Sequence, residues 1–160
     1  MKDYIEKVGV NVNRSSYRAT AEAALSTLTV REDLCRLFGA GDDPSYAIFT
    51  SGVTLSLNMI MKGVLRPGDH LIISGMEHNA VARPAMQLEA AGVKVSIAPC
   101  DDDGVLRLEE FERLFTPETR LVVMQYASNV SGTIQPVGEI GAICRRHGVL
   151  FASAAPPPAP

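Results

Sequence analysis

Short runs of apolar residues alternate along this chain with longer segments in which apolar side chains recur every three or four positions. The first pattern is typical of buried strands and the second of amphipathic helices. We predict strands at residues 46–49, 70–74, 93–98, 120–125 and 149–151, and helices at residues 54–65, 80–91, 108–115 and 136–146. An earlier helix is predicted to run to Phe38 from Ser15 or Ser16, either of which can cap it.

The order of these elements predicts the fold class. Strands that alternate with helices and are apolar on both faces indicate a mainly parallel sheet with helices on both sides. We therefore expect a three-layer α/β/α architecture with about five strands. In such sheets ligands bind outside the carboxyl ends of the strands.

Composition and charge exclude several classes of protein. The 160 residues carry a formal net charge of −3, and they show no stripe of lysine and arginine, which argues against nucleic-acid binding. The N-terminus lacks the apolar core of a signal peptide, and no apolar run is long enough to span a membrane. Three scattered cysteines predict no metal site. We expect a cytoplasmic protein.

Polar residues cluster where three predicted strands end, in residues 50–58, 76–79 and 128–133. In the first cluster Gly52 lies where a strand meets a helix, and Ser51 and Thr54 add hydroxyl groups. Backbone N–H groups at such a turn can bind a phosphate-sized anion. Taken alone, the turn is better explained as a plain helix cap.

The second cluster contains the histidine best placed for function. Asn79 can cap the following helix while His78 points into the crevice at the end of the strand. His70 and His147 are expected to be structural, since one starts a strand and the other ends a helix. The acidic segment 101–104 lacks the spaced ligands of a calcium loop, so we interpret it as a turn.

Five collinear motifs together resemble the class V aminotransferase group, specifically its cysteine desulfurase-like members, which use pyridoxal phosphate (PLP). The motifs are Phe49-Thr50-Ser51-Gly52 with Thr54 and Leu57-Asn58, Leu65-Arg66-Pro67-Gly68-Asp69-His70, Met76-Glu77-His78-Asn79 with Arg83-Pro84, Ser128-Asn129 with Gly132-Thr133, and residues 140–151. The similarity covers roughly residues 11–151, in the order typical of that family.

The resemblance implies a role for each matching position. Gly52, Val53 and Thr54 would hold the PLP phosphate through backbone amides and the Thr54 hydroxyl. His78 would stack on the pyridine ring as the catalytic histidine, and Asn129 would hydrogen-bond near the ring hydroxyl and the substrate carboxylate. The resemblance also implies a homodimer.

The chain departs from the family after Phe151. Ala154 and Pro157 stand where the family has an aspartate that keeps the pyridine nitrogen protonated and a glutamine near the ring oxygen. No lysine follows Lys94, so the Schiff-base lysine is absent, as are the persulfide-forming cysteine and the small domain. We expect the chain by itself to be inactive. Its expected parts are an N-terminal segment (1–14), a partial PLP-binding large domain (15–151) and an Ala/Pro-rich tail outside the sheet (152–160).

The implied function is cysteine desulfuration, in which L-cysteine yields L-alanine and an enzyme persulfide. Selenocysteine lyase and class V aminotransferase activities stay open within the family. A second hypothesis is a non-enzymatic remnant that dimerises or binds the PLP phosphate. A generic nucleotide-binding α/β domain ranks last, because the chain has neither G-x-G-x-x-G nor a P-loop.

Overall fold

The structure of the protein is a computed structural model that describes residues 2, 9–10, 12 and 18–154. The chain forms two compact units, residues 1–49 and residues 50–160. The division between them falls inside the segment 15–151 that we expected to be one domain. Each unit is described by itself.

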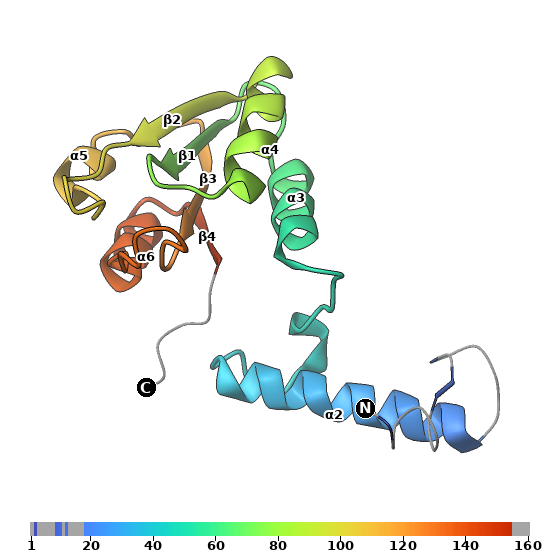
Figure 1. The fold of residues 1–160 in the computed structure, drawn as a ribbon. Helices are drawn as coiled ribbons and strands as arrows, with labels where there is room; N and C mark the ends of the chain where they lie inside the picture. Colours follow the sequence, from blue (N-terminus) through green and yellow to red (C-terminus); the bar gives the residue numbers. More distant parts are fainter. Residues whose placement is uncertain (1, 3–8, 11, 13–17, 155–160) are drawn as a thin grey trace. The chain divides into compact units, whose positions relative to one another are not determined.

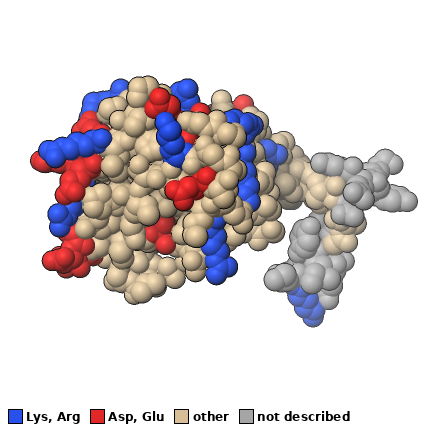
Figure 2. All heavy atoms as spheres, turned by 90° about the horizontal axis from the view of Figure 1, so that it is seen from above, with Lys and Arg blue, Asp and Glu red and all other residues tan. Residues whose placement is uncertain are grey.

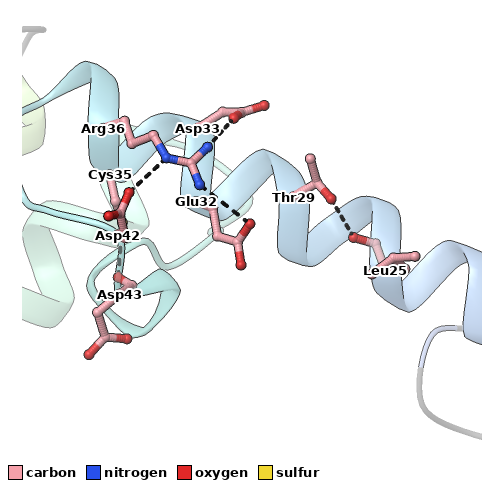
Figure 3. A network of polar contacts seen from close by, with 8 residues as sticks. All are labelled: Leu25, Thr29, Glu32, Asp33, Cys35, Arg36, Asp42 and Asp43. Atoms are coloured by element: carbon pink, nitrogen blue, oxygen red, sulfur yellow. Dashed lines mark hydrogen bonds and ion pairs between the residues drawn. The ribbon is translucent and has the colours of Figure 1, made fainter.

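The first unit is built on helix α2, Arg18–Leu37, followed by the short 3-10 helix η1, Pro44–Tyr46. This confirms the predicted long helix over its described part, whereas its proposed caps Ser15 and Ser16 lie outside the described residues. Arg36 joins the end of α2 to the next loop, since its guanidinium contacts Asp33 at 3.0 Å and Asp42 at 2.7 Å (Figure 3).

The predicted strand at residues 46–49 is wrong. The N–H groups of Tyr46 and Ala47 donate to Asp43 and Pro44 in the 3-10 turn, and the following residues have no strand beside them in the described part of the chain. Ile48 and Phe49 are correspondingly exposed. An apolar run alone does not make a strand, because a strand needs a neighbour to complete its ladder of hydrogen bonds.

The second unit contains a four-stranded parallel sheet in the order β2-β1-β3-β4. Its strands are β1, His70–Ser74; β2, Lys94–Ala98; β3, Thr119–Gln125; and β4, Leu150–Ala154. Because all four run the same way, their carboxyl ends meet at one edge. β4 extends to Ala154, three residues into the segment 152–160 that we expected to lie outside the sheet.

Helices cover both faces of this sheet (Figure 1). Their bounds are α3, Val53–Val64; α4, Asn79–Ala90; α5, Leu108–Glu112; and α6, Val137–Arg146. Side chains of α3 and α4 pack on one face with Leu71 and Ile73, and those of α5 and α6 pack on the other with Ile72. The two-residue period of a strand produces this division. The expected three-layer α/β/α fold is confirmed, with four strands in the sheet.

The surface of the molecule mixes both signs of charge. Figure 2 shows lysine and arginine side chains interspersed with aspartate and glutamate on the face that it presents. No helix in the described part of the chain is long and apolar enough to cross a membrane.

His70 lies at the amino end of the sheet, away from the predicted ligand edge. It is only 3% exposed, and its ring nitrogens lie 2.8 Å from the Thr119 hydroxyl and 2.9 Å from the Ser96 hydroxyl. The ring therefore ties β1 to both of its neighbouring strands, which supports the predicted structural role. Burial, with a smaller effect from the Lys94 charge, lowers the pKa of His70.

This lowered pKa predicts a specific loss of stability in acid. The unfolded chain takes up the His70 proton near pH 6.5, whereas the folded chain takes it up only at lower pH. The contribution of His70 is therefore complete above about pH 6.5 and declines as the pH falls below that value. Urea unfolding of the protein and of His70→Gln between pH 7.5 and pH 5.5 tests this, and equal acid-induced losses in both proteins would contradict it.

Candidate functional site

The carboxyl ends of β1, β3 and β4 and the start of α3 surround a cavity of about 290 Å³, called here the edge cavity. Its lining residues are Val53, Leu57, Glu77, His78, Ala80, Val81, Gln125, Ala127, Asn129 and Ala154. Three predicted site residues, Val53, His78 and Asn129, thus lie around one space. His78 and Asn129 follow β1 and β3, as expected for parallel strands that end at one edge, whereas Val53 follows the segment 46–49, which forms no strand.

A second hollow of about 350 Å³ lies between α3 and α4 and is called the interhelix cavity. Thr54 and His78 both line it, so His78 borders both cavities. Lys62 also lines it, with its ammonium group 2.9 Å from the Gln87 side-chain oxygen. Of the predicted site residues, only Gly52 lines neither cavity, since it forms the cap just before α3.

The turn at Gly52 leaves backbone donors free at the start of α3. Its carbonyl accepts hydrogen bonds from the N–H groups of Leu55 (3.1 Å) and Ser56 (3.2 Å), and no side chain caps the helix. The N–H groups of Val53 and Thr54 have no acceptor among the described residues. These two backbone donors and the exposed Thr54 hydroxyl, at a helix start, are groups that can bind an anion.

Two further contacts fix the shape of this turn. The Thr50 hydroxyl lies 2.7 Å from the Ser56 hydroxyl and donates to the Gly52 carbonyl at 3.1 Å. A Cβ atom on Gly52 would meet no atom within 4 Å, so the space beside the turn is open.

His78, rather than Asn79, is the capping residue of α4, which corrects the prediction. Its Nδ1 atom accepts a hydrogen bond from the Ala80 N–H at 3.0 Å. In the neutral ring, Nε2 therefore carries the proton. The cap also fixes the orientation of the imidazole at the border of the two cavities.

Glu77 is the residue that sequence reasoning missed at this edge. Its Oε1 atom accepts from the Ser74 hydroxyl at 2.6 Å and from the Gln125 N–H at 3.0 Å, so it joins the ends of β1 and β3. The Gln125 side-chain amide donates in turn to the Met76 carbonyl. Burial raises the pKa of Glu77, although these hydrogen bonds oppose the shift. The available signal was an acidic residue three positions after the end of a buried strand.

The loop that carries Asn129 is stabilised by its own backbone. The buried Ser128 hydroxyl accepts from the N–H groups of Val130 (3.3 Å) and Ser131 (3.2 Å), and the Ser128 N–H donates to the Thr133 carbonyl at 2.9 Å. Asn129 is exposed at the tip of this turn and lines the edge cavity. The sequence motif thus positions Asn129 through the hydrogen bonds of its neighbours.

The turn at residues 101–104 supports this loop. Asp101 accepts from the N–H groups of Asp103 and Val105, which confirms the predicted turn. The Thr133 hydroxyl donates to the Asp103 carbonyl at 2.7 Å. A Cβ atom on Gly104, whose φ is +80°, would come within 3.1 Å of Met76, next to Glu77. The turn therefore contacts both loops of the edge cavity.

Ala154 ends β4 at the floor of the edge cavity, where it pairs in register with Gln125. Pro157 lies outside the described residues. Among the described lysines, Lys94 begins β2 at the opposite edge of the sheet, and Lys62 contacts Gln87.

Comparisons with known proteins fit this geometry. The aminotransferase class-V family model matches residues 1–155. The mitochondrial cysteine desulfurase of Eremothecium gossypii is 44% identical over 115 residues, which is 69% of this chain and 24% of that protein. The cysteine desulfurase IscS of Rickettsia bellii is 36% identical over 147 residues, 89% of this chain and 35% of that protein.

Solved structures show the same relationship. A NifS-like protein superposes with a TM-score of 0.86 at 31% identity, covering 95% of this chain and 43% of its own. The apo cysteine desulfurase of Thermococcus onnurineus NA1 gives a TM-score of 0.86 at 27% identity, covering 96% of this chain and 39% of its own. The chain thus spans less than half the length of these proteins.

Proposed function

This chain belongs to the class V aminotransferase family, and we propose that it forms the phosphate-binding and ring-binding part of a PLP site in a cysteine desulfurase-like protein. The observation that carries the proposal is the convergence of Val53, His78 and Asn129 on the edge cavity, beside the free donors of α3. The family is PLP-dependent, and the similar proteins of Eremothecium gossypii, Rickettsia bellii and Thermococcus onnurineus are named cysteine desulfurases.

The residues present fit a phosphorylated pyridine ring. The walls of the edge cavity are mostly apolar with a few polar groups, which is the usual chemistry of a cofactor site. The start of α3 offers two backbone donors and one hydroxyl at the cavity border. When bound, PLP supplies an electron sink for negative charge that forms next to the substrate amino group.

Each residue has a defined task in this proposal. The N–H groups of Val53 and Thr54 and the Thr54 hydroxyl bind the phosphate, assisted by the dipole of α3. His78 lays its ring face against the pyridine, and its Nε2–H is free to donate because Nδ1 is held by Ala80. Asn129 donates its side-chain amide to the ring hydroxyl and orients the substrate carboxylate.

We propose L-cysteine as the substrate of the protein that contains this segment, on the strength of its relatives. A homodimer is also proposed. It is supported by exposed apolar residues on the side of α3 away from its own core, including Leu55 (46% exposed) and Met59 (53%). The expected cytoplasmic location stays a prediction, since the relatives include mitochondrial proteins.

The phosphate site is tested by titrating the chain with PLP. Thr54→Val should weaken binding about tenfold or more, because a hydroxyl that bonds a charged group contributes about 1.5–3 kcal/mol. Thr54→Ser retains the hydroxyl and should bind nearly as well as the parent protein. Equal affinity of the valine variant and the parent would contradict the phosphate site, and no binding by any of them would contradict the proposed function.

Binding by this chain alone should be non-covalent. Borohydride reduction of the PLP-loaded chain, followed by intact mass and peptide mapping, should find no stoichiometric pyridoxyl adduct. The lysines available are Lys2, Lys7, Lys62 and Lys94. Stoichiometric labelling of one of them, with release of sulfide from cysteine, would show that the chain is active by itself.

A further inference from the structure

The described residues that line the edge cavity include a single carboxylate, that of Glu77. Of its lining residues only Glu77 and His78 can ionise, and the others are apolar or carry neutral amides. Glu77 forms no ion pair with a lysine or arginine within the described part of the chain. A ligand in this cavity therefore meets one acidic group whose charge is not neutralised by a protein cation.

The carboxylate of Glu77 is fixed in position but is not saturated with hydrogen bonds. Oε1 accepts from the Ser74 hydroxyl and the Gln125 N–H. Oε2 accepts only a longer hydrogen bond, 3.2 Å, from the same Gln125 N–H. A carboxylate oxygen can accept two hydrogen bonds, so Oε2 retains capacity for a donor from a ligand.

The surroundings of Glu77 favour a positively charged hydrogen-bond donor on the ligand. Burial raises the pKa of Glu77, so a nearby positive charge would restore the stability of its ionised form. The groups that face it are His78 in the cavity and, from the segment after β2, the Cys100 thiol, whose pKa is itself raised by burial and by the charges of Asp101 and Glu77. None of these is a permanent cation.

The neighbouring strand supplies no competing acid. Ala154, the last residue of β4, lines the same cavity and pairs in register with Gln125, whose N–H bonds Glu77. A methyl group there leaves Glu77 as the only carboxylate among the described residues that line the cavity at the ends of β1, β3 and β4. The carboxylate that a ligand in this cavity can contact is therefore that of Glu77, in the loop after β1.

We propose that Glu77 holds the protonated ring nitrogen of the pyridine ligand in the edge cavity, through an N–H···O hydrogen bond to its carboxylate. This inference rests on the proposed function and adds a ligand contact to it. It requires no covalent step, since the proton stays on the ring nitrogen and the carboxylate stays ionised. The Glu77 carboxylate stabilises the protonated ring more than the neutral ring. The ring nitrogen therefore keeps its proton to a higher pH in the bound ligand than in the ligand free in water.

The test uses 4-deoxypyridoxine 5′-phosphate, which lacks the aldehyde and cannot react with lysine, labelled with ¹⁵N in the ring. Affinity is measured by fluorescence titration, and protonation is measured by the ¹⁵N chemical shift across pH. Glu77→Gln keeps the size of the side chain and should weaken binding about tenfold or more. It should also lower the pH at which the bound nitrogen loses its proton. Glu89→Gln, on the exposed surface of α4, is the matched control and should change neither.

A rescue variant separates ligand contact from structural support. Glu77→Gln combined with Ala154→Asp places a carboxylate on the adjacent strand of the same cavity, and it should restore the protonated nitrogen signal. A residue with only a structural role would lower the unfolding temperature without moving the ¹⁵N titration.

The outcomes distinguish this inference from the proposed function. If the parent chain binds the analogue and Glu77→Gln leaves affinity and ¹⁵N titration unchanged, the role of Glu77 is overturned and the phosphate site stands. If the parent chain does not bind the analogue, both are overturned. If Glu77→Gln does not fold, the test is made on the parent protein alone. The proposal is then overturned if the ring nitrogen of the bound analogue loses its proton at the same pH as that of the free analogue in water.

Discussion

Replacing Met61 with alanine is expected to lower the free energy of unfolding by about 2–5 kcal/mol. Met61 is fully buried on the inner face of α3, in the same core cluster as Leu71 and Val123 of the sheet. The substitution removes apolar contacts and leaves a cavity in a closely packed layer. The free energy of unfolding of a stable domain is only about 5–15 kcal/mol, so this loss is a large fraction of it.

Met59 provides a matched control on the same helix. Its side chain is 53% exposed on the side of α3 away from the core, so Met59→Ala should change stability by less than about 0.5 kcal/mol. Urea unfolding of both variants measures the difference. Equal losses would mean that α3 does not pack on the sheet as described. Since α3 begins at the proposed phosphate-binding turn, Met61→Ala should also weaken PLP binding at temperatures near its unfolding transition.

Replacing Gln135 with alanine is expected to lower the free energy of unfolding by about 2–4 kcal/mol. Gln135 is 2% exposed, and its side-chain amide donates to the Gly104 carbonyl at 2.7 Å and accepts from the Leu106 N–H at 2.9 Å. The variant would leave both of these backbone groups without a partner in a buried place. Each unpaired group costs about 1–3 kcal/mol.

The same change should have a local effect at the edge cavity. The turn that Gln135 holds contacts Met76 and Thr133, so hydrogen exchange of residues 128–133 should become faster in the variant. Gln87→Ala is the control, since Gln87 is exposed and bonds only the Lys62 ammonium. Unchanged exchange in residues 128–133, with normal stability, would contradict the supporting role of Gln135.

Much of the fold follows from local pattern. In β1, Leu71 and Ile73 pack on one side of the sheet and Ile72 on the other, because successive side chains of a strand point to opposite faces. The sequence also predicted where helices end. Gly92, which has a φ of +96°, lies just after the end of α4. The exception is the apolar run 46–49, which forms no strand, because pairing depends on a neighbour that the run itself does not specify.

The sequence by itself determined that the segments after β1 and β3, which carry His78 and Asn129, meet at the ligand edge. Parallel strands joined by right-handed crossovers leave little freedom in that respect. The sequence also placed Val53 there, although the strand at 46–49 that this prediction relied on does not form. It could not assign tasks to Glu77 and Gln135, which accept hydrogen bonds from the N–H groups of Gln125 and Leu106, 48 and 29 residues away in the chain. Only the tertiary structure decided that Glu77 joins the ends of β1 and β3 and lines the edge cavity. That role depends on distances between atoms of different elements, which are set by packing and not by local preference.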